Sequence, residues 1–282
     1  MKIFETIDQI TRFLSEKRAS GERIGFVPTM GALHDGHLSL IRLAKADCDL
    51  VVSSIFVNPT QFNNPEDLKN YPRMPESDSQ MLAEVGTDVL FSPAVSEMYA
   101  EGFGTLQDVD LGGLEKVMEG AHRPGHFKGV VQVVSKLFDI VQPHVAYFGE
   151  KDYQQLAVIR RMTEQLGYNI EIVGCPTIRE SDGLAMSSRN LRLSAEERKV
   201  AVKISEALKY IQTNWKKKSP EQLIAEATQQ LESTGILKPE YIEIADAKDL
   251  HEVRDSNYSK PMRAFAAVFC GPVRLIDNIS IS

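Results

Sequence analysis

The sequence predicts an α/β protein in which a doubly wound, Rossmann-like parallel sheet is followed by a second, smaller α+β domain. Short apolar runs alternate with amphipathic segments as far as residue 176, which is typical of a parallel sheet with helices on both faces. After Pro176 a polar stretch leads into helical segments and then into strands. A chain of 282 residues also exceeds what one core usually fills. We therefore expect two domains, 1–176 and 177–282.

The first domain begins with a β-α-β unit. Residues 6–19 carry apolar side chains at helical spacing, and residues 23–27 form the first apolar strand. A tight turn and an amphipathic segment over 38–46 follow. The nearly continuous apolar run over 49–57 is typical of a strand covered on both faces. Two strands joined in this way should be parallel, with a right-handed crossover.

The same alternation continues to the end of the first domain. It predicts further helices over 77–85, 125–141 and 153–166, and further strands over 88–91, 145–148 and 169–173. The five predicted strands should form one sheet, and ligands on such sheets bind beyond the carboxyl ends of the strands.

The second domain opens with a polar segment over 177–193. Ser194–Glu197 is a capping box, and Ser219 precedes a proline at a first helical position, so helices should begin at both points. Lys216–Lys218 predicts a solvated linker between helices. Strands are expected over 241–245, 264–270 and 273–276.

Composition narrows the class of protein. The formal net charge of −7 argues against a general binder of nucleic acid or of membrane surfaces. The three cysteines lie far apart without C-x-x-C spacing, which favours buried thiols in a reducing compartment. The N-terminus lacks the apolar run of a signal peptide, and no stretch is long enough to span a bilayer. We expect a cytoplasmic protein.

The stretch over 28–37, P-T-M-G-A-L-H-D-G-H, joins the first strand to the next helix. His34 and His37 are three residues apart, so both rings can face one ligand at a helix start. Free backbone N–H groups and the helix dipole attract phosphate there, and imidazole adds a donor. The stretch is neither a Walker A loop nor G-x-G-x-x-G. It predicts a nucleotide phosphate site, although a chance pair of surface histidines, or a zinc pair completed by His122 and His126, remains an alternative.

Four more polar clusters could share this site. Three follow predicted strands or precede predicted helices, and the fourth lies in the polar segment between the domains. Each has a plain alternative: an ordinary turn, an exposed loop or a hinge. Their conjunction at one edge of one sheet favours a common site. The clusters are Asn58–Phe62, His122–Lys128, Gly149–Asp152 with Gln155 in the following helix, and Met186–Asn190.

These motifs resemble a known family. His34-x-x-His37 and Met186–Arg189 are similar to the HIGH and KMSKS elements of class I aminoacyl-tRNA synthetases and related nucleotidyltransferases. Together with F-V-N-P-T-Q-F, R-P-G-H-F-K-G-V, F-G-E-K-D-Y-Q-Q-L and R-E-S-D-G-L-A-M-S-S-R-N, they closely resemble the pantothenate synthetase (pantoate–β-alanine ligase) family. The motifs keep that family's order between residues 28 and 190, and the last hundred residues carry no motif that we match.

The resemblance implies a two-step ligase reaction. The pantoate carboxylate attacks the α-phosphorus of ATP, which gives pantoyl adenylate and pyrophosphate. The amine of β-alanine then attacks the acyl carbon and releases AMP and pantothenate. The resemblance also implies Mg²⁺ that bridges ATP phosphates mainly through water, and a homodimer formed through the first domain. Asp78 is an acidic residue nearby, but we assign no protein ligand to the metal.

The family pattern also assigns residues to roles. His34 and His37 would bind the ATP phosphates, with His37 as the proton donor, while Lys151, Ser187, Ser188 and Arg189 would hold the phosphates in the transition state. Pantoate would bind Asn58, Gln61 and Gln155, and β-alanine would bind Gln61 and Arg123. The remainder of the expected nucleotide site is Met30, Gly31, Ala32, Leu33, Asp35, Gly36, Gly149, Glu150, Asp152, Ile178 and Met186.

Two other functions compete with this interpretation. A related nucleotidyltransferase would act on a phosphorylated substrate, but the amides of Gln61 and Gln155 favour an uncharged hydroxy acid. A nucleotide sensor without turnover would not need both Lys151 and the loop over 187–189. A zinc-dependent hydrolase is the remaining alternative for the histidine pair.

Overall fold

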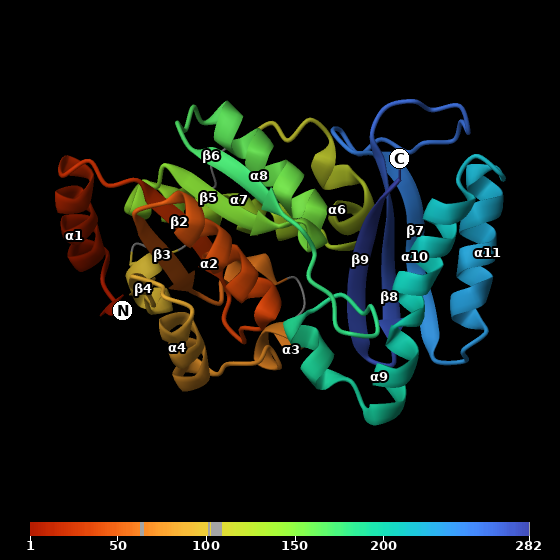
Figure 1. Cartoon of the computed structure of the whole chain (residues 1–282), viewed down its shortest axis with the longest axis horizontal. Helices are drawn as coiled ribbons and strands as arrows, with labels where there is room; N and C mark the ends of the chain where they lie inside the picture. Colours follow the sequence, from red (N-terminus) through yellow and green to blue (C-terminus); the bar gives the residue numbers. More distant parts are fainter. Residues whose placement is uncertain (63–64, 101, 103–108, 282) are drawn as a thin grey trace.

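The computed structural model describes residues 1–62, 65–100, 102 and 109–281 (Figure 1). Its first part is a parallel six-stranded sheet with the strand order β1-β4-β3-β2-β5-β6. The order runs outward in both directions from the neighbouring strands β2 and β5, so their carboxyl ends flank the crevice in which such sheets bind ligands. The strands are β1 Lys2–Phe4, β2 Ile24–Thr29, β3 Leu50–Ile55, β4 Val89–Phe91, β5 Val145–Gly149 and β6 Glu171–Cys175.

The sequence missed one strand of this sheet. Five strands were expected, and the sixth is β1, which pairs in parallel with β4 at the edge of the sheet. Three residues are too few to show an alternating pattern, so pairing with β4 rather than local sequence defines this strand.

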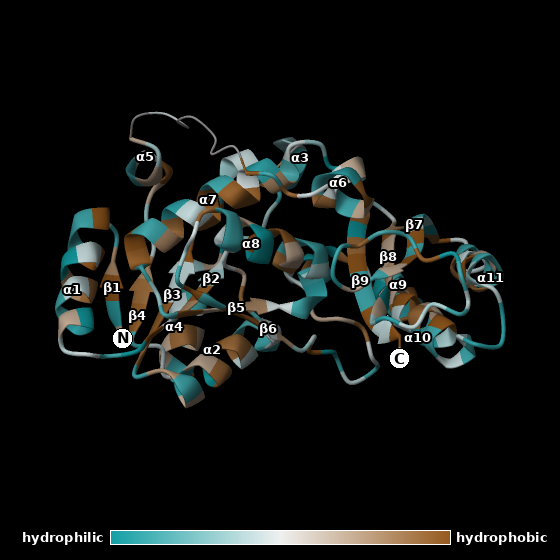
Figure 2. Cartoon of the chain, turned by 90° about the horizontal axis from the view of Figure 1, so that it is seen from above, coloured by the Kyte–Doolittle hydropathy of each residue, from teal (hydrophilic) through white to brown (hydrophobic). Residues whose placement is uncertain are grey.

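Helices cover both faces of the sheet, as predicted (Figure 2). On one face α1, α7 and α8 bury Leu14, Phe138 and Ile159 against strand residues such as Phe26. On the other face α2 and α4 pack through Ile41 and Leu82. The helices of this part are α1 Ile7–Ala19, α2 Asp35–Asp47, α3 Pro65–Lys69, α4 Pro75–Glu84, α5 Val95–Met98, α6 Met118–His122, α7 His126–Val141 and α8 Tyr153–Gln165.

The second part is an antiparallel sheet of three strands, β7 Leu237–Asp246, β8 Met262–Cys270 and β9 Val273–Ile281. The helices α9 Ala195–Ala201, α10 Lys203–Asn214 and α11 Pro220–Glu232 accompany it, and α10 and α11 build its core with the sheet. The capping boxes at Ser194 and Ser219 are confirmed. The fold class is therefore confirmed, with a doubly wound parallel sheet and a smaller α+β part beside it (Figure 1).

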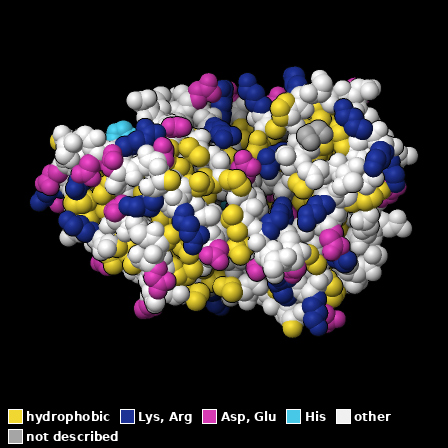
Figure 3. Space-filling model, in the orientation of Figure 1, with side chains coloured by type: hydrophobic (Ala, Val, Ile, Leu, Met, Phe, Trp, Pro, Cys, Tyr) yellow, Lys and Arg dark blue, Asp and Glu magenta, His cyan; other side chains and the backbone are white. Residues whose placement is uncertain are grey.

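The domain boundary predicted between residues 176 and 177 falls in the connection after β6, and we keep it as a proposal. Lys216–Lys218 lies between α10 and α11, where Lys218 forms an ion pair with Glu226. Basic and acidic side chains are interspersed over the face in Figure 3. Among the described residues, no helix has the length and apolar character needed to cross a bilayer.

Candidate active site

A pocket opens at the carboxyl ends of β2 and β5, where the strand order diverges. The β2–α2 turn, the β5–α8 turn, helix α7 and the segment over 176–189 line it, and its empty volume is about 1230 Å³, open mouth included. Most of the predicted site residues meet here. Those that line the pocket are Met30, His34, Gly36, His37, Gln61, Gly149, Lys151, Asp152, Gln155, Ile178, Met186, Ser187, Ser188 and Arg189.

The backbone of the β2–α2 turn is stabilised by hydrogen bonds to the buried carboxylate of Asp78. Gly31 and Ala32 have φ values of +79° and +49°, the left-handed region that glycine adopts readily and alanine rarely. Asp78 of α4 accepts hydrogen bonds from the backbone N–H groups of Ala32 and Leu33, both at 2.8 Å. Each oxygen of this carboxylate therefore accepts one backbone hydrogen bond from the turn. Gly31, Ala32 and Leu33 support the site from outside the pocket lining.

His34 and His37 cap the start of α2 with their own side chains. The Nδ1 atom of His34 accepts from the N–H of Gly36 at 3.1 Å, and Nδ1 of His37 accepts from the N–H of His34 at 3.3 Å. A neutral ring that accepts at Nδ1 carries its hydrogen on Nε2, so each imidazole keeps one Nε2–H donor. Asp35 begins α2 beside them and lies outside the pocket lining. This capping explains why α2 starts three residues before the predicted helix.

Both imidazoles are neutral at pH 7. Burial, together with the positive charge of Lys151, lowers the pKa of His34 to about 4. Burial and the neighbouring His34 and Lys151 lower the pKa of His37 to about 3. The rings lie with their centroids 4.1 Å apart. Together they offer hydrogen-bond donors without a fixed charge.

Lys151 supplies the positive charge opposite the histidines. It lies in the short turn Glu150–Asp152 after β5, with its Nζ atom 3.7 Å from a carboxylate oxygen of Asp152. The side chain is 16% exposed and lines this pocket and a smaller one beside it. The side chain of Glu150 points away to Arg263 of β8.

The loop over Met186–Arg189 closes the pocket from the side of the second part. Ser187 accepts from the backbone N–H of Arg189 and caps the 3₁₀ turn Ser188–Arg192. Ser188 donates to the carbonyl of Ala32 at 2.9 Å. Nη2 of Arg189 lies 2.9 Å from Asp67 of α3, which also holds Arg192. The guanidinium of Arg189 is thus paired with a carboxylate at the edge of the pocket.

An amide pair and a group of apolar side chains also line the pocket. Nε2 of Gln61 donates to Oε1 of Gln155 at 3.4 Å. The sequence interpretation missed the apolar wall. A signal was present, because α7 carries apolar residues around most of its circumference, which is more than one buried face requires. The wall consists of Phe56, Val130, Val133, Val134 and Leu137.

Asn58 lies outside this lining. It is 1% exposed, and its amide donates to the carbonyl of Gly129 at 3.1 Å and accepts from the hydroxyl of Tyr99 at 2.8 Å. These contacts tie the turn that carries Gln61 to α7. In this structure the side chain of Asn58 supports Gln61 from behind the pocket.

Arg123 lines the smaller pocket, which has an empty volume of about 400 Å³ and shares Lys151 and Gln155 with the larger one. Its guanidinium donates to Nε2 of His126 at 3.2 Å, so His126 donates from Nδ1 to the carbonyl of Gln61 at 2.9 Å. Arg123 is therefore linked through His126 to the backbone of Gln61.

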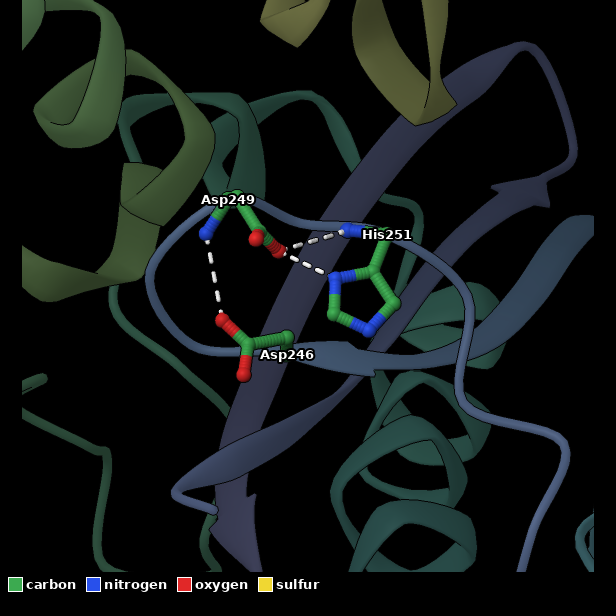
Figure 4. A group of neighbouring side chains, drawn as sticks. All are labelled: Asp246, Asp249 and His251. Atoms are coloured by element: carbon green, nitrogen blue, oxygen red, sulfur yellow. Dashed lines mark hydrogen bonds and ion pairs between the residues drawn. The ribbon is translucent and has the colours of Figure 1, made fainter.

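His122 and His126 do not join His34 and His37 in one cluster, as a zinc site would require. His122 stacks on Tyr241, and His126 is held between Arg123 and Gln61. Within the described part of the chain, one group offers three potential metal ligands within 4.8 Å of one another, and it lies at the end of β7 and in the loop that follows (Figure 4). It consists of Asp246, Asp249 and His251. Asp246 accepts from the backbone of Asp249 at 3.2 Å, and Asp249 binds His251, so the group stabilises its own loop.

Comparisons with known proteins point to one family. A family model described as pantoate-beta-alanine ligase matches residues 2–280. A pantothenate synthetase of Porphyromonas gingivalis is 50% identical over 279 residues, which cover 99% of both chains. The crystal structure of pantothenate synthetase from Thermus thermophilus superimposes with a TM-score of 0.92 at 44% identity, covering 99% of both chains. The crystal structure of pantoate-beta-alanine ligase from Francisella tularensis, complexed with beta-gamma ATP and beta-alanine, superimposes with a TM-score of 0.83 at 40% identity. The match covers 99% of this chain and 97% of that one.

Proposed function

This chain belongs to the pantoate–β-alanine ligase family, and we propose from this premise how its pocket carries out the reaction. The chain is a ligase that condenses pantoate with β-alanine at the expense of ATP, through pantoyl adenylate, with release of AMP and pyrophosphate. The observation that carries the residue assignment is the convergence of His34, His37 and Lys151 with the loop over 187–189 on one pocket.

The phosphates of ATP bind between the histidines and the loop. Two neutral Nε2–H donors and the ammonium group of Lys151 meet the oxygens on which charge accumulates as pyrophosphate departs. Preorganised donors stabilise such charge without having to reorganise during the step. Because the pKa of His37 is far below 7, it serves in the free enzyme as a hydrogen-bond donor, and a bound phosphate is needed before the ring can hold a second proton.

Ser187, Ser188 and Arg189 complete the phosphate site from the loop before α9. Arg189 is paired with Asp67 in the structure, so it must exchange this carboxylate for phosphate to contribute to the reaction. Such an exchange couples nucleotide binding to movement of the loop. The rest of the nucleotide lies against Met30, Gly149, Asp152, Ile178 and Met186.

Pantoate binds at the amide pair. Its two hydroxyls and carboxylate match the amides of Gln61 and Gln155, and its two methyl groups match the apolar wall of α7. Asn58 contributes by holding the turn of Gln61. β-Alanine then approaches from the side of Gln61 and Arg123, whose guanidinium suits a carboxylate.

Magnesium acts with ATP. Among the described residues that line the larger pocket, Asp152 is the only one with a carboxylate, and its side chain is 48% exposed. This donor set would fit an ion held mainly by phosphate oxygens and water, and Asp152 would be the carboxylate available to it in this pocket. When bound, the ion neutralises phosphate charge. We also propose that the protein is a homodimer formed through its first part, as in the family that it resembles, and that it works in the cytoplasm.

The test is pantoate-dependent exchange of labelled pyrophosphate into ATP, with magnesium present and β-alanine absent. Exchange is expected because adenylate formation is reversible, and added β-alanine should divert the adenylate to pantothenate and AMP. If folded, ATP-binding protein shows no exchange with pantoate, the acyl-adenylate mechanism is wrong. Turnover that needs a phosphorylated substrate and no amine would instead identify a nucleotidyltransferase.

A further inference from the structure

The turn that carries Lys151 is fixed by a residue of the last strand. The side-chain amide of Asn278 in β9 donates to the carbonyl of Glu150 at 2.9 Å and to the carbonyl of Lys151 at 2.8 Å. Asn278 is 3% exposed, so water does not replace these bonds easily. Two consecutive carbonyls of the β5–α8 turn are therefore held by the second part of the molecule, 127 residues further along the chain.

The amide of Asn278 can face the turn in only one orientation. Its oxygen accepts from Nε of Arg263 at 2.8 Å, so its NH₂ group must point at the two carbonyls. Arg263 also donates to the carboxylate of Glu150 at 3.3 Å, and its guanidinium lies 4.2 Å from the ring centroid of Tyr153. Glu150 is thus bound at its backbone carbonyl by Asn278 and at its side-chain carboxylate by Arg263.

Strand alternation directs Asn278 toward Lys151. Along β9, Val273 and Leu275 belong to the core of the second part, whereas Arg274 and Asn278 contact the first part. Asn278 is the residue on that face whose amide reaches the turn of Lys151.

We propose that Asn278 is a positioning residue for the phosphate-binding Lys151, through which the second part of the chain controls adenylate formation. This inference rests on the proposed function, because it assumes that Lys151 meets the phosphates of ATP. Without the amide, two part-buried carbonyls lose their donor and the turn relaxes, which moves the Nζ atom. A displacement of this kind, far from the reacting atoms, can cost about 100-fold in rate.

The experiment is a double-mutant cycle read by single-turnover formation of pantoyl adenylate at saturating ATP and pantoate. Asn278→Ala removes both donors, and Asn278→Asp keeps the partner of Arg263 while offering the carbonyls no hydrogen at pH 7. Each variant is made with Lys151 and with Lys151→Ala. Tyr241→Phe is the matched control, because it removes one 2.8 Å hydrogen bond between the two parts, to Glu119, without touching the Lys151 turn. Tyr241 lines the smaller pocket, but β-alanine, the substrate proposed to bind there, is absent from this assay. Thermal unfolding identifies folded variants, and Asn278→Asp serves if Asn278→Ala does not fold.

With Lys151 present, we expect both substitutions of Asn278 to slow adenylate formation about 10- to 100-fold. With Lys151→Ala they should change the rate less than about 2-fold, because a residue that acts through another has no separate effect once that residue is gone. Tyr241→Phe should keep the wild-type rate.

Equal losses in both backgrounds, or an equal loss in Tyr241→Phe, would show that Asn278 only helps the two parts to dock. A wild-type protein that forms no adenylate overturns the proposed function itself. A wild-type protein that forms adenylate at a rate unchanged by Asn278→Ala overturns the role of Asn278 alone.

Discussion

The hydroxyl of Ser188 donates a hydrogen bond to the carbonyl of Ala32, 156 residues earlier in the chain, at 2.9 Å. Ser188 is 7% exposed and Ala32 is 1% exposed, so this bond is shielded from water. It joins the loop before the second part to the turn that carries both histidines. Closure of the loop and the shape of the phosphate site are thereby coupled.

Ser188→Ala should lower both stability and adenylate formation. A buried hydrogen bond of this kind contributes about 1 kcal/mol, and its loss also frees the loop from the histidine turn. Urea denaturation and pyrophosphate exchange measure the two effects. Ser233→Ala is the control, since it removes an exposed serine-to-backbone bond in the second part. If Ser188→Ala retains full exchange, the coupling between loop and turn has no role in the reaction.

His37→Ala and Lys151→Ala should reduce adenylate formation far more than they reduce stability. Removing one preorganised donor from a charge-stabilising site costs about 100- to 1000-fold in rate. Neither side chain belongs to the main hydrophobic clusters. His251→Ala, at an exposed histidine outside the pocket, should leave the rate unchanged. Parallel losses of rate and stability in the pocket variants would remove the basis for these roles.

The two pocket histidines should make the protein less stable in acid. Their folded pKa values, about 4 and about 3, lie below the unfolded value of 6.5, so the unfolded state binds more protons at low pH. Each group should therefore reduce the free energy of unfolding by about 1 kcal/mol per pH unit as the pH falls from 6.5 toward its folded pKa.

The measurement is urea denaturation at several pH values between 4.5 and 7. His37→Gln, which cannot gain a proton, should show a shallower decline than the wild type. Identical slopes would mean that the pKa of His37 is the same in the folded and the unfolded protein. ATP should reverse the trend for the complex, because phosphate favours the charged ring.

Asp78→Asn should disturb the site without changing any residue that lines it. The amide can accept only one of the two backbone hydrogen bonds and places an NH₂ group against the other donor. A buried N–H left without a partner costs about 1–3 kcal/mol. We expect lower stability together with weaker ATP binding, measured by denaturation and by calorimetric titration. Asp8→Asn, at an exposed acid in the first turn of α1, should change neither quantity.

Local patterns in the sequence were sufficient to predict five of the six strands and the five longer helices of the first part, and the capped helices of the second, but not the short helices α3, α5 and α6. Apolar periodicity, serine caps and glycine turns act over a few residues, so they can be read directly. The strand β1 could not be predicted in this way, because three residues are too few to show a period. Only its pairing with β4 defines it. The apolar wall of α7 was overlooked although the excess of apolar residues in this helix was visible in the sequence.

The sequence by itself determined which side chains could serve a phosphate site, because His34, His37, Lys151 and the loop over 187–189 stand at the ends of recognisable elements. Only the tertiary structure decided what holds them in place. Asp78 under the turn, Ser188 on Ala32 and Asn278 behind Lys151 are separated from their partners by 45 to 156 residues. Contacts between residues so far apart in the sequence depend on the order of the strands and on how the two parts pack together. Neither of these produces a periodic pattern or a motif spacing in the sequence.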